Sequence, residues 1–520
     1  MIGVLLGLIP LVFMFIGIMV LKWPTHKAGL LSTALALIIS FIFSGTSIPI
    51  LAAGWLYGIL VIHKYTLAWI CSFFLTFYML TNGCFDIIRD ALKRMPGGKV
   101  FKIYFLCFGI GILMLSAGAG IDWIAMVLSS YGINAWAVPI LVDGSCDAFS
   151  QFAYLSTPIT VPVQVFGKTF GFTEGDLAGI LGRFMWFTVP IFTLAILWTL
   201  KRDGLKVNAK HAASVAVYGV ILAAVANLLL STISIMGVGV MLGLFAVAFL
   251  LLVNIVGSRM GVFKSEDNAE LSPMTGEQKK QLLRALAPIL IVSTITSMVS
   301  LPWIAQVLDP IVINIPVIAD QVIPFQIFQP YVWSLISIVF SLIIIKPTRK
   351  TISESASLLK KRLIPYLIAS WVCSGMVFTY NWSGMVINIQ NKLVLPPERA
   401  DLNLINALAN AASSAGPTLY IALVPFLAIF GCMLFGSELT STLFFVRFHF
   451  IAAKNLGIMK PLILIGGHII SNLGIVDVRK MARSLAIIGA YGEEWKTMRF
   501  TFVLGLIITI LIVPLLFLLF

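Results

Sequence analysis

The sequence predicts an all-α, polytopic membrane protein, and three observations carry this prediction. The chain has 520 residues, of which 60% are hydrophobic and only 11% are charged, with a mean hydropathy of +1.03. A soluble domain carries about 25% charged residues. Apolar stretches recur along the whole chain, and a helix of about 20 residues crosses a hydrocarbon core of about 30 Å. We therefore expect about 12 to 14 transmembrane helices in a multi-pass protein of the plasma membrane.

Basic residues set the expected topology. The first apolar run, 1–21, has neither a basic start nor a small-residue cleavage site, so we expect it to remain as the first helix. The net charge is +14, and basic residues gather in four loops at 89–99, 201–210, 258–283 and 346–362. Two predicted helices lie between the second and third loops, and two lie between the third and fourth. An even number of crossings returns the chain to the same side, so we expect these three loops to share the cytoplasmic side. The first loop joins them only if one segment between 100 and 199 is re-entrant. The charge thus indicates topology, and no nucleic-acid partner is expected.

The chain divides into two predicted halves that carry a faint internal repeat. The charged stretch 258–283 is the expected cytoplasmic connection between an N-terminal half, 1–257, and a C-terminal half, 284–520. Each half contains a glycine-containing break, then a polar break, then a helix with an arginine. These are 116–122, 143–151 and Arg183 in the first half, and 436–438, 466–472 and Arg499 in the second. Paired broken segments indicate a secondary transporter with its substrate near the membrane midplane.

The most distinctive polar break lies in the second half. Residues 434–442 read LFGSELTST inside an apolar run. A carboxylate at the bilayer centre costs at least about 2.5 kcal/mol, so it marks a functional site. Glycine and serine alone would serve close helix packing, but packing needs no carboxylate. We expect Glu438 to couple transport to a proton or ion, and Ser437, Thr440 and Ser441 to line the substrate site.

The breaks of the first half carry further candidates. Asp143 and Asp147 are four residues apart, so a helix would place both carboxylates on one face, as a proton carrier needs. The alternative is that both lie solvated at the membrane surface. The run that holds Ser116, Gly118, Gly120 and Asp122 is the expected partner of the Glu438 break. Its first three members are expected to line the substrate site and Asp122 to couple the ion, although the glycines could instead serve packing alone.

Basic and amide side chains complete the expected site. Arg183, Arg479 or Arg499 could offset the charge of an anionic substrate, although such arginines often extend from helix ends toward water. Asn381 follows an apolar helix and either lines the cavity or caps a turn. His468 is a candidate proton relay, or else a polar residue whose hydrogen bonds are satisfied within the protein.

Other functional classes find less support in the sequence. The six cysteines form no CxxC pair and lie in or beside apolar segments, so neither a disulfide framework nor a metal site is expected. No GxxxxGK[ST] run is present to bind ATP. No catalytic dyad has a useful spacing, so we expect neither an enzyme nor a cofactor. A channel remains an alternative, and its flux would grow linearly with substrate concentration.

Several strings resemble the L-lactate permease family, which includes glycolate permeases, and the resemblance runs over nearly the whole chain. The family strings G-x-F-D-I-I-R, N-Y-S-G and G-S-D-T-S-S are matched by GCFDIIR at 83–89, NWSG at 381–384 and GSELTS at 436–441. The resemblance implies proton-coupled uptake of 2-hydroxymonocarboxylates, namely lactate and glycolate. It also implies two inverted repeats, each with a re-entrant hairpin and a broken helix, and an elevator-like mechanism by analogy.

The sequence departs from the family in three of the breaks, and in one of them the family's N-T-A-P becomes CDAF at 146–149. Where the family reads E-G-A-A-G-F-G-A-P, residues 114–122 read MLSAGAGID, so the glutamate becomes Met114 and Asp122 replaces the proline. Where the family reads K-M-I-S-P-Q, residues 474–479 read GIVDVR, which adds Asp477 and Arg479. The expected partners are a small organic anion, a proton or sodium, and the lipid bilayer, with a homodimer as a further option. A dicarboxylate or an inorganic anion remains an alternative substrate, since the second broken helix also holds Lys480 and Arg483.

Overall fold

The computed structural model describes residues 2–118, 120–259, 273–299, 301–308, 311–490 and 494–520. These residues are mostly helical, with two short antiparallel strand pairs. Ten described helices are long and apolar enough to cross a membrane, or up to eleven with the pair α3 (Ile48–Val61) and α4 (His63–Thr81), which is bent by 50°. The all-α polytopic class is confirmed. The described candidate spans are fewer than the expected 12 to 14 because short, broken helices take the place of several continuous ones. Two of the ten, Lys99–Ser116 and Pro417–Phe435, are arms of the hairpins described below.

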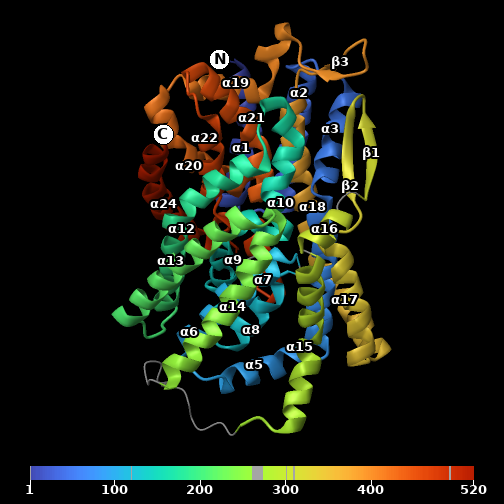
Figure 1. Cartoon of the computed structure of the whole chain (residues 1–520). Coiled ribbons are helices and arrows are strands. Elements are labelled where there is room, and N and C mark those ends of the chain that lie inside the picture. The colour runs from blue at the N-terminus through green and yellow to red at the C-terminus, as the bar shows by residue number, and fades with distance from the viewer. Residues whose placement is uncertain (1, 119, 260–272, 300, 309–310, 491–493) are drawn as a thin grey trace.

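The longest helix organises one side of the molecule. α18 (Arg349–Trp382) packs against α2 (Thr25–Ile42), α3 and α4, and α1 (Ile2–Met19) packs against α2. Beside them stand α15 (Gly276–Val299), α16 (Pro302–Leu308) and α17 (Pro330–Ile345). β1 (Val312–Ile318) and β2 (Gln321–Gln326) form a hairpin along α3 (Figure 1). A second small pair, β3 (Val386–Ile387) and β4 (Leu393–Val394), lies near the end opposite α5 (Cys84–Arg94).

The first half contains a re-entrant hairpin. α6 (Lys99–Tyr104), η1 (Phe105–Ile110) and α7 (Gly111–Ser116) rise to the middle of the molecule, and α8 (Asp122–Ser130) returns (Figure 1). Gly118 and Gly120 make the turn with φ of +67° and +77°, which favours glycine. Beyond α8, Asn134 Nδ2 donates to Asp203 Oδ1 at 2.9 Å, so the hairpin ends beside the second basic loop.

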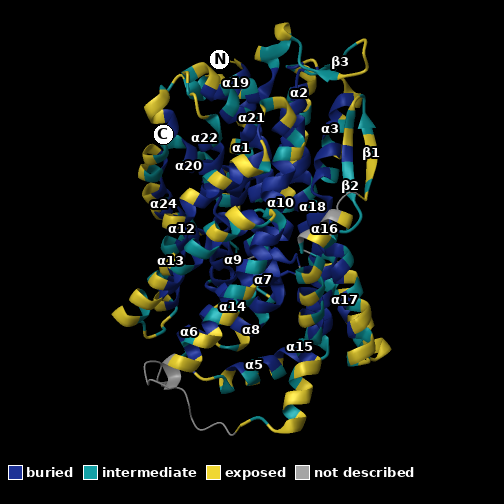
Figure 2. Ribbon diagram, viewed as in Figure 1, coloured by how far each residue is buried: buried dark blue, intermediate teal, exposed yellow. Residues whose placement is uncertain are grey.

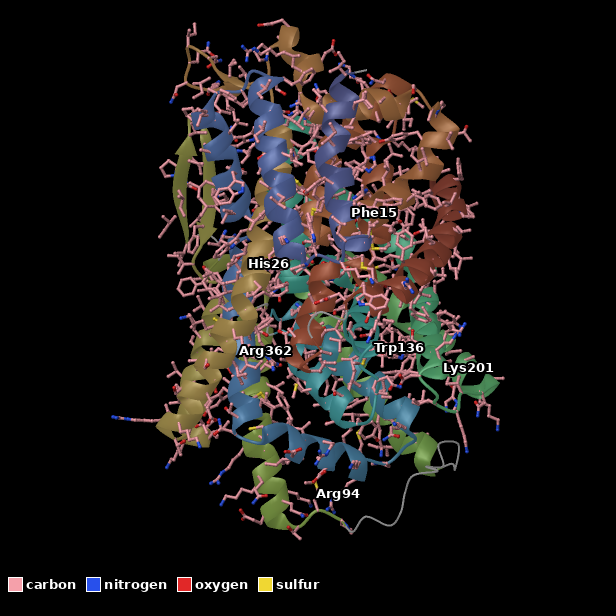
Figure 3. All side chains as sticks on the ribbon, turned by 180° about the vertical axis from the view of Figure 1, so that it is seen from behind. Phe15, His26, Arg94, Trp136, Lys201 and Arg362 are labelled. Atoms are coloured by element: carbon pink, nitrogen blue, oxygen red, sulfur yellow. The ribbon has the colours of Figure 1, made fainter. Side chains whose placement is uncertain are left out.

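This hairpin is a candidate for the re-entrant segment between residues 100 and 199 on which the sidedness of the first basic loop depends. It brings the first basic loop to the same end of the molecule as the other three. Figure 3 shows Arg94, Lys201 and Arg362 in that half of the molecule. By the positive-inside rule we expect this end to be cytoplasmic, and we call the end with β3 and β4 the outer end.

The first broken helix follows the hairpin. α9 (Val138–Asp147) rises to the middle, and the chain continues through η2 (Ser150–Phe152), α10 (Ala153–Pro162), η3 (Val163–Gly167) and α11 (Lys168–Phe170). Left-handed backbone at three successive residues, 154–156, marks the break. α12 (Glu174–Arg202), α13 (Ala209–Thr232) and α14 (Ile235–Arg259) complete the half.

The second half repeats this order from the opposite end. After η4 (Pro397–Leu402) and α19 (Leu404–Ser413), α20 (Pro417–Phe435) descends from the outer end, turns at Gly436 with φ of +59°, and returns as α21 (Glu438–Leu456). The second broken helix is α22 (Pro461–Ser471), η5 (Gly474–Val476) and α23 (Val478–Ile487), and α24 (Glu494–Leu519) follows. Asn455 Nδ2 donates to Asn410 Oδ1 at 2.7 Å, which places the outer end of the hairpin beside α19.

The two hairpins therefore enter from opposite ends, and their turns lie in the buried centre (Figure 2). The repeat order expected from the sequence is present, as hairpin, broken helix and long helix. In the expected connection 258–283, residues 260–272 lie outside the described residues, and 276–283 belong to α15. The division of the chain into halves at this connection stays a prediction.

The direction of the first hairpin can be tested with cysteine labelling. Ser129 is exposed near the end of α8, Ile389 is exposed between β3 and β4, and all six native cysteines are buried. We expect a membrane-impermeant maleimide to label Ser129→Cys only in inverted vesicles and Ile389→Cys only in intact cells. Labelling of Ser129→Cys from outside would mean that the segment crosses the membrane completely.

Candidate functional site

A cluster of charged side chains lies at the centre, where the turns of the hairpins meet the breaks of the two broken helices. It holds five carboxylates and three cations, almost all buried: Asp122, Asp143, Asp147, Glu438, Asp477, Arg479, Lys480 and Arg483. Asp122 and Glu438 are the first residues of α8 and α21. Asp143 and Asp147 share α9 as expected, and the three cations follow the start of α23. Ionised groups here must find partners within the protein.

Arg483 connects the second broken helix to both breaks of the first half. Its Nε lies 2.9 Å from Asp122 Oδ1 and its terminal nitrogen 2.7 Å from Asp143 Oδ1. Ser72 donates a hydrogen bond to Asp122 Oδ2 at 2.9 Å, and Ser484 donates to Asp143 Oδ2 at 3.0 Å. One guanidinium thus ties α8, α9 and α23 together, with each carboxylate oxygen in contact with a donor group.

Lys480 forms a second connection between the halves. Its Nζ lies 2.7 Å from Glu438 Oε1 and 3.8 Å from Asp147 Oδ1. The backbone N–H of Ile475 donates to Asp147 Oδ2 at 2.8 Å. A Cβ atom at Gly474 would fall within 3 Å of all three charged side chains, so only glycine fits this place.

Arg479 keeps unused hydrogen-bond donors. Asp477 caps α23 by accepting from the backbone N–H of Arg479 and Lys480, and its Oδ1 lies 3.7 Å from Arg479 Nε. Among the described residues, however, neither Nε nor one terminal nitrogen of Arg479 has a hydrogen-bond partner. The Arg479 side chain lies against the turn at Gly436, and Thr440 Oγ1 nearby on α21 also lacks a partner. Free donors on a buried cation suit an anionic ligand.

A chain of four hydrogen-bonding side chains leads away from the second turn. Ser441 Oγ lies 3.0 Å from His468 Nε2, and His468 Nδ1 lies 3.1 Å from His449 Nε2. His449 Nδ1 lies 2.7 Å from the hydroxyl of Tyr420. All four side chains are buried, and Tyr420 lies near the outer start of α20. Such a chain can pass a proton between neighbours.

The structure brings together most, but not all, of the expected site residues. Glu438, Asp122, Asp143, Asp147 and Arg479 lie in the cluster, and Ser437, Thr440 and Ser441 form the first turn of α21. Gly118 and Gly120 form the other turn, next to Ser116, whose buried hydroxyl lacks a partner among the described residues.

Three expected residues lie elsewhere. Arg183 and Arg499 are exposed on α12 and α24, as arginines that extend toward water would be, so neither can offset charge in the cluster. Asn381 lies at the end of α18, where its backbone oxygen accepts from Arg447 at 2.9 Å.

Sequence reasoning missed the roles of Arg483, Lys480 and Asp477. The signal was available, because VRKMAR places Arg479 and Arg483 four residues apart on one helix face, directly after a capping aspartate. His449 and Tyr420 gave no comparable signal, since each is separated from the polar breaks by several apolar residues.

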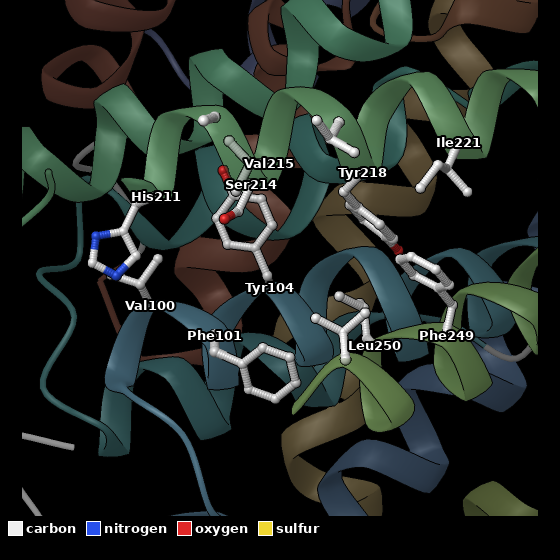
Figure 4. A pocket seen from close by; sticks show the side chains of 13 residues that line it. Val100, Phe101, Tyr104, His211, Ser214, Val215, Tyr218, Ile221, Phe249 and Leu250 are labelled. Carbon is white, nitrogen blue, oxygen red and sulfur yellow. The ribbon is translucent and has the colours of Figure 1, made fainter. Parts of the chain in front are cut away.

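A cavity of about 400 Å³ between α6, α13 and α14 has a different character (Figure 4). Val100, Phe101, Phe249 and Leu250 line it, and it holds no carboxylate, lysine or arginine. Its apolar wall suits a hydrocarbon chain rather than a small anion.

The chain has relatives among known proteins over nearly its whole length. A sequence profile described as L-lactate permease matches residues 3–520. The L-lactate permease of Escherichia coli (strain K12) is 23% identical over 551 residues, which cover 98% of this chain and 94% of the relative. The L-lactate permease of Salmonella typhimurium (strain LT2) is 22% identical over 550 residues, with the same two shares covered. Glycolate permease GlcA of Escherichia coli (strain K12) is 25% identical over 202 residues, 37% of this chain and 35% of the relative.

The Arg483 contacts predict a large effect of its removal. We expect Arg483→Met to lower the free energy of unfolding by about 3–5 kcal/mol, because Asp122 and Asp143 would stay buried without a cation. The matched control is Lys350→Met, which removes an exposed pair 4.0 Å from Glu354 and should change stability by less than about 1 kcal/mol. Thermal unfolding of the purified proteins compares the two, and equal melting temperatures would contradict the assigned role of Arg483.

Proposed function

The chain belongs to the L-lactate permease family, and from this we propose that it carries a 2-hydroxymonocarboxylate, lactate or glycolate, together with a proton. As a member of this family it is a multi-pass permease of the plasma membrane rather than an enzyme. The observation that carries the finer proposal is the central cluster, where carboxylates and cations meet between two oppositely directed hairpins. Paired broken segments of this kind hold the substrate in secondary transporters.

The substrate carboxylate is proposed to bind Arg479 at the second turn. Arg479 has free donors, and α21 begins at this turn, so its first N–H groups and the positive end of its dipole face the same place. Ser437, Thr440 and Ser441 add hydroxyl groups. Arg483 and Lys480 already contact carboxylates of the protein. Arg479 has a longer contact with a protein carboxylate, 3.7 Å to Asp477, so among the described cluster cations it favours a substrate with one carboxylate over a dicarboxylate.

The charge balance of the cluster supports coupling to a cation. Five carboxylates face three cations, which leaves two carboxylates in excess when all are ionised. Burying unpaired charge is costly, so protons are proposed to neutralise the excess while the substrate is bound. Glu438 is the proposed carrier because it shares Lys480 with Asp147 and lies beside the substrate turn. The Ser441–His468–His449–Tyr420 chain offers a proton path toward the outer end.

Alternating access then follows from the two hairpins. Each approaches the cluster from one side of the membrane, so either could cover the site while the other side opens. We propose that the hairpins and broken helices move against the frame formed by α18 with α2, α3 and α4. A sodium-coupled cycle would use the same geometry, so the transport experiment described below is needed to distinguish the two coupling ions.

Glu438→Gln tests the coupling residue. Glutamine keeps a hydrogen-bond acceptor for Lys480 but cannot exchange a proton, so we expect proton-driven uptake of L-lactate to be lost while the protein still folds. Uptake of labelled L-lactate by reconstituted vesicles measures this, with Glu354→Gln, an exposed carboxylate, as the control. Full proton-coupled uptake by Glu438→Gln would overturn the assignment of Glu438.

The identity of the coupling ion and of the substrate can be determined with vesicles in which one ion gradient is imposed at a time. We expect an inward proton gradient, and not a sodium gradient, to drive uptake of L-lactate and glycolate into vesicles. Dicarboxylates should enter poorly because Arg483 and Lys480 already lie 2.7 to 2.9 Å from protein carboxylates, which leaves Arg479 as the described cluster cation for a substrate carboxylate. Uptake that follows the sodium gradient would contradict proton coupling and indicate sodium as the coupling ion. A flux that rises linearly with substrate concentration, without saturation, would indicate a channel.

A further inference from the structure

Besides the apolar cavity beside α6, the protein has a polar cavity, which lies between the central cluster and the outer end. Its volume is about 410 Å³, within the usual range for small-ligand sites. Tyr57 of α3, Phe170 of α11, Asn381 and Trp382 of α18, Asn406 of α19 and Arg447 of α21 all line it. Both halves of the chain therefore contribute. Arg447 lies nine residues beyond Glu438 on α21, about 13 Å farther along the helix axis, so the cavity is distinct from the cluster.

Arg447 brings a positive charge to this cavity. One terminal nitrogen donates to the backbone oxygen of Asn381 at 2.9 Å. No carboxylate of the described residues lies within 4 Å of its guanidinium, and none of the residues lining the cavity is acidic. An arginine at membrane depth is normally paired, and its planar fork matches a carboxylate in two-point contact. The cavity thus has a cation whose counter-ion is not supplied by the described part of the protein.

Two amide groups add a complementary requirement. The side-chain oxygens of Asn381 and Asn406 are buried without a hydrogen-bond partner among the described residues. These oxygens only accept hydrogen bonds, so a carboxylate cannot satisfy them. A hydroxyl group can. A ligand that carries one carboxylate and a neighbouring hydroxyl would meet both the cation and an acceptor.

We infer that this cavity is an outer binding site for 2-hydroxymonocarboxylates. The carboxylate pairs with Arg447, the 2-hydroxyl donates to Asn381 Oδ1, and the rings of Tyr57 and Trp382 contact the short alkyl group. The inference rests on the proposed transport function and adds a site that captures the substrate before it reaches the cluster. Asn381 acts here as a specificity residue, and Arg447 as the anion-binding residue.

The site predicts a particular selectivity. Propionate has the same carbon skeleton as lactate but lacks the hydroxyl, so its binding would leave the acceptor of Asn381 buried and unpaired. Sites built to bond a hydroxyl discriminate strongly against analogues that lack it. Glycolate keeps the hydroxyl and loses only the methyl contact, so it should bind more weakly than lactate but better than propionate.

Cysteine protection tests the site directly, without a transport measurement. Thr169 is an exposed residue of the cavity, and the six native cysteines are buried, so Thr169→Cys gives an impermeant maleimide one target from the outside. We expect L-lactate to slow its labelling and propionate at equal concentration to have little effect. In Thr169→Cys/Arg447→Gln the concentration of L-lactate needed for protection should rise about tenfold or more.

Three comparisons make the outcome decisive. Arg399→Gln removes a half-buried arginine at the outer end that does not line the cavity and should leave protection unchanged. Arg447→Lys keeps the charge and should retain part of the protection, which separates lost binding from lost folding. Glu438→Gln should keep full protection even where coupled transport is lost, so this site and the proposed function can fail separately. Equal protection by lactate and propionate, or unchanged protection in Arg447→Gln, would overturn the inference.

Discussion

Charged groups buried away from water need partners inside the protein, and this requirement organises the centre of the molecule. Arg483 reaches two carboxylates of the first half, and Lys480 contacts one carboxylate from each half. These pairs hold the first turn, both broken helices and the second turn in one arrangement. A substrate anion or a proton that enters this cluster changes its charge balance, so binding at one break alters the contacts of all the others.

Backbone geometry imposes a related constraint. A chain that turns or breaks at membrane depth leaves N–H and C=O groups outside regular helices, and such groups are tolerated only against protein or a water-filled cavity. The turns at Gly120 and Gly436 and the break at 154–156 all lie in the buried centre. Because one hairpin comes from each end, the same point can be reached from either side of the membrane. That arrangement is what alternating access requires.

One helix carries three parts of the proposed transport path. α21 begins with Glu438 in the cluster, presents Arg447 to the outer cavity and holds His449 in the hydrogen-bonded chain. Any displacement of this helix would move the coupling carboxylate, the outer cation and the proton path together. Phe450 of the same helix stacks on Phe170 at 4.2 Å, which links this movement to the first half.

The sequence by itself determined the membrane class, the order of the repeat and the family, and it left open whether a segment between residues 100 and 199 is re-entrant. Composition decides the membrane class, the spacing of glycine and polar breaks decides the repeat, and short strings such as GSELTS at 436–441 carry the family resemblance. It also identified Glu438, Asp143 and Asp147, because a carboxylate in an apolar run is conspicuous. It left open whether Arg183 and Arg499 face water or the site, since an arginine in a helix looks the same in either case. Only the tertiary structure decided which charges pair, because contacts such as Arg483 with Asp143 join residues 340 positions apart, and local patterns carry no information about them.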